Sequence, residues 1–136
     1  MKKLIAIIFI SAILTVLGWF VIYYVHLKGE ENHVENISAL CQYFGIVKAV
    51  NNTYDPSGGY STDKHLIDII DVDVIGQECR EKLNTNQNRI IDTLGGYYEL
   101  STIDDHFVKV IRFSNNANVN NIPNEISMKD GKVMKF

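Results

Sequence analysis

The sequence has 136 residues, with 13 basic and 16 acidic side chains and a formal net charge of −3. All sixteen acidic residues but only ten of the basic ones follow residue 28, so the part from 29 to 136 carries a net charge of −6. This part lacks the excess of cations that phosphate binding needs, which excludes nucleic acid as an expected partner.

The first predicted element is a membrane helix over residues 4–25, which contain no charged side chain. About 20 apolar residues in a helix cross a bilayer. Lys2 and Lys3 precede the run, which predicts a cytoplasmic N-terminus, and Trp19, Tyr23 and Tyr24 gather near the outer end, where aromatic rings favour the interface.

The alternative to an anchor is a cleaved signal peptide. The apolar run is longer than the usual hydrophobic region of a signal, and Tyr-Tyr-Val-His is not a small-residue cleavage site. We therefore expect residues 1–28 to be a signal anchor that crosses a bacterial inner (cytoplasmic) membrane once. Residues 29–136 then form a domain in the periplasm or another extracytoplasmic space.

Cys41 and Cys79 are the only two cysteines. An exported domain meets oxidising conditions, so a disulfide between them is expected. It would close a loop of about 39 residues and contribute roughly 4 kcal/mol through chain entropy. Two buried free thiols are the alternative.

Apolar residues recur at spacings of three and four after residue 33, which predicts an amphipathic helix that buries one stripe: Val34, Ile37, Leu40, Cys41, Phe44, Val47 and Val50. Gly29 is the sole breaker before it, so the membrane helix is expected to continue into this helix with a soft point there. The turn-forming run NNTYDPSGG ends the helix by about Asn51.

The middle of the chain is less regular. Ser61 or Thr62 could cap a short helix with Leu66, Ile67 and Ile70, whereas the alternation over residues 70–74 fits a strand equally well. One or two helical turns are expected between residues 75 and 83, followed by a polar loop over residues 84–88.

The last third alternates with the period of strands. Residues 98–103 and 107–113 predict a hairpin joined at Asp104-Asp105, with Val108, Val110 and Arg112 on one face. An asparagine-rich loop over 115–121 and a final short strand over 132–136 follow. The expected fold class is α+β, an N-terminal transmembrane helix continuing into a long amphipathic helix packed on a small C-terminal antiparallel sheet.

This order of elements resembles the type IV pilin-like proteins, most of all the major pseudopilin of type II secretion. The segment from Leu40 through Gly59 and Tyr60 is similar to the family's helix and Gly-x-Tyr-Pro loop. The segment Asp92-Thr-Leu-Gly95-Gly-Tyr-Tyr98 resembles the family's Asp-Pro-Trp-Gly-x-Pro-Tyr, and residues 107–118 resemble the strand and loop that follow. Asp92, Gly95 and Tyr98 are expected to form a structural turn, because an aspartate caps amides and a glycine takes positive φ.

The chain also departs from that family. It has no acidic residue between Lys3 and Glu30, so the family's prepilin cleavage signal is absent. The family's calcium loop contains aspartates, whereas residues 115–121 supply only asparagine side chains as oxygen donors, which would give a weak calcium site at best. No cofactor is therefore expected.

No catalytic motif emerges from the sequence. Four histidines lack metal-ligand spacing: His26, His33, His65 and His106. The acidic cluster Asp68, Asp71 and Asp73 fits a solvated face better than a cation site, and Asp104-Asp105 fits a turn. The first hypothesis is therefore a membrane-anchored, pilin-like interaction module that binds secretion or envelope-assembly proteins. The second is a tethered inhibitor or immunity-type protein with one protein partner, and an enzyme is the least favoured.

Overall fold

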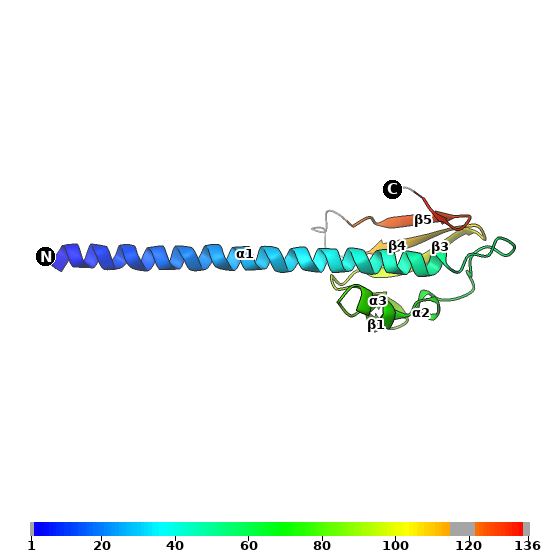
Figure 1. Ribbon diagram of the computed structural model, residues 1–136, viewed down its shortest axis with the longest axis horizontal. Helices are drawn as coiled ribbons and strands as arrows, with labels where there is room; N and C mark the ends of the chain where they lie inside the picture. The colour runs from blue at the N-terminus through cyan, green and yellow to red at the C-terminus, as the bar shows by residue number, and fades with distance from the viewer. Residues whose placement is uncertain (1, 115–121, 135–136) are drawn as a thin grey trace. The chain divides into compact units, whose positions relative to one another are not determined.

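The computed structural model describes residues 2–114 and 122–134 and separates the chain into two compact units, Met1–Val34 and Glu35–Phe136 (Figure 1). The domain boundary expected after residue 28 lies inside the first unit. Helix α1, Lys2–Asn51, begins in the first unit and ends in the second, and it is not interrupted at Gly29. The helix ends at Asn51, as the turn-forming residues after it predict.

The first unit consists of the N-terminal part of α1. Every side chain that the structure describes over residues 7–31 is exposed, although most of them are apolar. The hydroxyls of Ser11 and Thr15 donate hydrogen bonds to carbonyl oxygens about one turn earlier, so these polar groups are paired inside the helix. Within the described residues, α1 is the one helix that is long and apolar enough to cross a membrane.

The second unit contains a six-stranded antiparallel sheet whose strands follow one another in chain order. Its strands are β1 Asn84–Asn86, β2 Arg89–Ile91, β3 Tyr97–Asp104, β4 Phe107–Phe113, β5 Glu125–Lys129 and β6 Lys132–Val133. A long apolar N-terminal helix followed by a C-terminal antiparallel sheet gives an α+β fold, and the predicted β3–β4 hairpin is confirmed.

Three strands, β1, β2 and β5, were not expected from the sequence. Residues 84–88, expected to be a polar loop, instead form β1 and the turn into β2, in which Gln87 and Asn88 have φ of 49° and 64°. Asp130 and Gly131 join β5 to β6 with φ of 50° and 74°. Positive φ at both central residues is the geometry of a tight hairpin turn, so turn chemistry connects both pairs of strands. Strand β5 also alternates polar and apolar residues, and its Ile126 and Met128 are fully buried. The asparagine loop 115–121 and the end of the predicted last strand, residues 135–136, lie outside the described residues.

Two short helices precede the sheet, α2 Leu66–Ile69 and α3 Val72–Glu78. The N-cap of α2 is His65, without a side-chain cap, rather than Ser61 or Thr62. The strand alternative for residues 70–74 is wrong, because α3 begins there. Its N-cap Asp71 accepts hydrogen bonds from the amides of Asp73 and Val74 at 3.1 and 3.2 Å, which stabilises the first turn of a helix.

The core of the second unit lies between α1 and the inner face of the sheet. Tyr43 is fully buried there, its hydroxyl donates to the carbonyl oxygen of Val110 at 2.8 Å, and its ring centroid lies 5.0 Å from that of Tyr98. Figure 1 shows this part of α1 running along the sheet. The other fully buried side chains of the core include Ala39, Ile46, Val108, Val110, Ile126 and Met128.

The buried stripe predicted for α1 is wrong in part. Three of its members are exposed, with exposed fractions of 56%, 54% and 42%: Val34, Ile37 and Phe44. Leu40 and Cys41 are half-buried, and only Val47 and Val50 are fully inside. The face of α1 that is buried contains Tyr43 and Ile46 instead. The ring of Tyr43 can be buried because its hydroxyl donates to a backbone carbonyl oxygen of the sheet.

Candidate functional site

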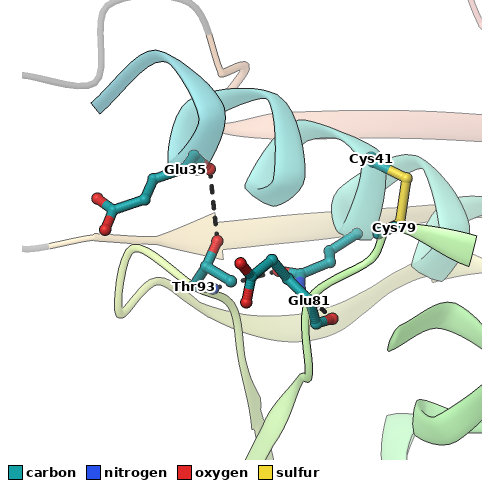
Figure 2. Close-up of a disulfide and its surroundings, with 6 residues drawn as sticks. Glu35, Cys41, Cys79, Glu81 and Thr93 are labelled. Atoms are coloured by element: carbon teal, nitrogen blue, oxygen red, sulfur yellow. Dashed lines mark hydrogen bonds between the residues drawn. A yellow bond between two sulfur atoms is a disulfide. The ribbon is translucent and has the colours of Figure 1, made fainter. Parts of the chain in front are cut away.

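Cys41 and Cys79 form a disulfide, with their Cα atoms 5.6 Å apart, so the expected pairing is confirmed (Figure 2). Cys41 lies on α1 and Cys79 is the C-cap of α3. The bond therefore fixes α3 to the long helix. Beside it, a Cβ on Gly45 would lie 3.0 Å from Cγ2 of Ile75, so the small residue allows α3 to approach α1 closely.

The residue after Cys41 fixes two further segments to α1. The side-chain amide of Gln42 donates to the carbonyl oxygen of Glu81 at 3.0 Å, and its oxygen accepts from the amide of Thr93 at 3.2 Å. The hydroxyl of Thr93 donates to the carbonyl oxygen of Glu35 at 3.4 Å, as Figure 2 shows. Gln42 is fully buried, so these bonds satisfy a polar group whose burial the sequence does not predict.

The predicted turn residues Asp92, Gly95 and Tyr98 lie together in the structure. The buried carboxylate of Asp92 accepts hydrogen bonds from the amides of Leu94 and Gly96, both at 2.9 Å, and from the hydroxyl of Tyr98 at 2.7 Å. Gly95 has a φ of 77°, which few other residues adopt. The turn is therefore built around one carboxylate.

Arg112 completes this turn and was missed as a partner. Its Nε donates to Oδ2 of Asp92 at 2.7 Å and its Nη2 to Oδ1 at 3.2 Å, and its guanidinium lies so close to Gly96 that a Cβ there would overlap it. The alternation of the sequence predicts Arg112 on the same strand face as Val108 and Val110. A charged residue on an apolar face signals a buried partner of opposite charge, and that signal could have identified the pair.

The surroundings of this pair shift two pKa values. Burial, and then the charge of Asp92, raises the pKa of Tyr98 above its ordinary value. Burial lowers the pKa of Arg112, but the hydrogen bond and the charge of Asp92 outweigh it and raise this pKa overall. In the part of the chain that the structure describes, no buried side-chain nitrogen or oxygen lacks a hydrogen-bond partner. The network therefore fixes the turn to β4.

Gly59 and Tyr60, the predicted loop residues after the first helix, contact two turns of the sheet. Gly59 has a φ of 77°, and a Cβ there would overlap the carbonyl oxygen of Asp105. The hydroxyl of Tyr60 donates to Oδ1 of Asn51 at 3.2 Å and accepts from the amide of Gly131 at 3.1 Å. The loop is thus joined to the β3–β4 and β5–β6 turns.

Aromatic rings pack in the same region. The Tyr54 ring centroid lies 5.0 Å from that of Tyr60, and the Tyr54 hydroxyl is 3.1 Å from Nδ1 of His106. The same His106 nitrogen is 3.7 Å from a carboxylate oxygen of Asp130. Desolvation, more than the nearby carboxylates, raises the pKa of Tyr54, and desolvation also raises that of Tyr60.

The other candidate residues are dispersed. His26 and His33 belong to the first unit, while His65 precedes α2 and His106 lies in the β3–β4 turn. The acidic residues Asp68, Asp71 and Asp73 belong to α2 and the start of α3, and Asp104 caps the amide of His106 at 2.8 Å. Among the residues with described placement, no group of three histidine, cysteine or acidic side chains could hold a metal ion.

The outer face of the sheet carries a stack of planar side chains, in which Phe113 and Arg89 are exposed and Tyr97 is half-buried. The rings of Tyr97 and Phe113 lie 5.0 Å apart at an interplanar angle of 16°, and the guanidinium of Arg89 lies 4.5 Å from the Tyr97 centroid. Arg89 is also 4.0 Å from the carboxylate of Glu99. Tyrosine and arginine are enriched among the residues that contribute most of the binding free energy at protein interfaces.

No protein-family model matches the chain, and no curated protein or solved structure matches it.

Proposed function

We propose that this chain is a membrane-anchored, pseudopilin-like interaction module. Residues 4–25 span a bacterial inner membrane with the N-terminus in the cytoplasm, and the second unit is displayed on the opposite side. There it binds protein components of secretion or envelope assembly.

The exposed apolar helix is the observation that carries the proposal. The described side chains over residues 7–31 have no protein cover, so the first unit presents a long hydrophobic surface. Such a surface is unfavourable in water and favourable in the hydrocarbon of a bilayer. Lys2 and Lys3 before the run support the orientation, since basic residues favour the cytoplasmic side.

The disulfide supports an extracytoplasmic domain. Cys41 and Cys79 are paired in the second unit, and disulfides persist outside the reducing cytoplasm. A domain outside the cytoplasm and a tether inside the membrane together suit a protein that meets partners at the membrane surface.

The pilin-like part of the proposal is supported by the second unit. Its segment of α1 packs on an antiparallel sheet, and Asp92, Gly95 and Tyr98 lie together in a turn before the central hairpin. The proposal does not include prepilin processing, because no acidic residue lies between Lys3 and Glu30.

Co-purification from detergent-solubilised membranes tests the proposal. We expect the full-length chain in the membrane fraction, crosslinked to copies of itself or to secretion or envelope-assembly proteins. One stoichiometric partner with toxin or hydrolase activity would instead favour the inhibitor or immunity function and contradict the proposal.

A variant of the outer sheet face sharpens this experiment. Phe113→Ser removes the exposed ring that stacks on Tyr97, and we expect it to reduce partner recovery, since aromatic side chains dominate interface energetics. Val133→Ser is a matched control, because Val133 is similarly exposed on β6. Equal loss of the partner in both variants would argue against binding through the aromatic stack.

A further inference from the structure

The outer face of the sheet has an apolar centre that takes no part in the core of the second unit. It consists of four side chains on three neighbouring strands, Ile91, Tyr97, Ile111 and Phe113. Cross-strand pairing aligns Ile91 with Tyr97 and Tyr97 with Phe113. None of the four belongs to the buried core of the described residues or packs against it, and Phe113 is 38% exposed. Apolar side chains gathered on an open sheet face mark a site of association.

Charged residues of both signs lie beside this apolar centre, in one row across the sheet. From β2 to β5 the row contains, in order, Arg89, Glu99, Ile111 and Glu125. Arg89 lies 4.0 Å from Glu99, and Lys109 donates to Glu125 at 2.9 Å. The row therefore begins with a basic residue on β2 and ends with an acidic residue on β5.

This arrangement is complementary to itself. Two copies can face each other about a two-fold axis that runs parallel to the strands between β3 and β4, so that β2 of one copy lies opposite β5 of the other. Arg89 then meets Glu125 of the second copy, and Tyr97 meets Phe113 of the second copy, each twice in the dimer. Packed sheets lie about 10 Å apart, a distance that side chains from the two faces fill together.

The direction of α1 agrees with this axis. Figure 1 shows the part of α1 in the second unit running along β4 and β5. Rotation about an axis parallel to the strands therefore leaves this part of both helices pointing in the same direction, which suits two chains that enter one membrane. An axis along the charged row would instead reverse one helix and place Arg89 opposite Arg89 and Glu125 opposite Glu125.

We propose that the outer face pairs two copies of this chain, with their apolar centres packed together and Arg89 of each copy beside Glu125 of the other. The inference names the partner of the aromatic surface invoked in the proposed function. It rests on that function, because the shared membrane holds the two copies parallel.

Analytical ultracentrifugation of the full-length protein in density-matched detergent measures the association. We expect dimers whose Kd rises at least about ten-fold in Phe113→Ser, because each dimer loses two rings from the centre of its interface. Val133→Ser, which changes a similarly exposed residue on β6, should leave the Kd unchanged. A monomer at every concentration, or equal dimerisation of Phe113→Ser and the parent chain, would overturn the inference.

Mixing two charge-reversal variants tests the axis itself. Arg89→Glu and Glu125→Arg each place like charges together at two contacts of their own dimer, whereas a mixed dimer restores opposite charges at both. Affinity-tagged Arg89→Glu should therefore retain at least about five-fold more untagged Glu125→Arg than untagged Arg89→Glu. Both positions are exposed, so the variants should unfold thermally near the Tm of the parent chain. Equal retention of the two untagged chains would overturn the pairing.

These outcomes differ from those that contradict the proposed function. A chain that sediments with membranes but stays monomeric contradicts only the pairing of copies. An uncleaved chain in the soluble fraction contradicts the membrane anchor, and with it both proposals. A foreign protein that is recovered in place of a second copy, and is lost in Phe113→Ser, would also overturn the pairing.

Discussion

Replacing Asp92 by alanine should be among the most destabilising single changes in the second unit. The substitution leaves the guanidinium of Arg112 buried without its carboxylate and removes the acceptor of the Tyr98 hydroxyl and of two turn amides. Breaking a buried ion pair by removing one partner costs about 3–5 kcal/mol. That is a large part of the roughly 5–15 kcal/mol that stabilises a typical domain.

Urea unfolding of the full-length protein in detergent, followed by near-UV circular dichroism of its tyrosines, measures this cost. Asp55→Ala is the matched control, since Asp55 also accepts local hydrogen bonds, from the amide and hydroxyl of Ser57, but is exposed. Those bonds hold the pKa of Asp55 below its ordinary value. Asp55→Ala should nevertheless lower the free energy of unfolding much less than Asp92→Ala, because it leaves no buried charge unpaired.

A double variant separates the ion pair from the rest of the turn. Asp92→Ala combined with Arg112→Met removes both charges, so its cost should fall short of the sum of the two single costs by about 2 kcal/mol or more. Additive costs, or a loss below about 1 kcal/mol for Asp92→Ala alone, would refute the role assigned to the pair.

Three further predictions concern the same unit. Replacing both Cys41 and Cys79 by alanine should lower the free energy of unfolding by about 4 kcal/mol, measured by urea titration, because a loop of about 39 residues is no longer closed; no change in the midpoint would contradict this. Gly95→Ala should cost about 1–2 kcal/mol because of its positive φ, whereas Gly59→Ala should cost more, since the same φ is combined with a steric overlap; equal shifts in Tm would be inconsistent with the loop geometry. Burial raises the pKa of Tyr98 above the unfolded value of about 10. Above that pH the folded chain retains a proton that the unfolded chain loses, so the free energy of unfolding should fall as the pH rises. A urea midpoint that stays constant from about pH 9 to about pH 11 would contradict the shift.

The features predicted from the sequence are those that one segment determines by itself. The uncharged run over residues 4–25 needs no tertiary partner to predict a long apolar helix, and the alternation over residues 107–113 predicts both the strand and the face that carries Val108 and Val110. The cysteine pair could be expected because only one pairing exists within the chain.

The features that were missed depend on distant partners. Tyr43 and Gln42 are polar enough to suggest a solvent-facing position, yet acceptors and donors far along the chain allow both to be buried. Arg112 is buried because Asp92 lies opposite it. Strand β1 has no apolar residue, so only its turn at Gln87 and Asn88 indicates the pairing.

In the proposed topology, the apolar helix lies in a membrane and the second unit lies outside the cytoplasm. Gly58 is a suitable reporter position, because it is exposed and a Cβ there would have no atom within 4 Å. In bacterial spheroplasts expressing Gly58→Cys, a membrane-impermeant maleimide should modify the new thiol before lysis, and the labelled full-length chain should sediment with the membranes. Modification only after lysis, or an uncleaved chain in the soluble fraction, would contradict the account.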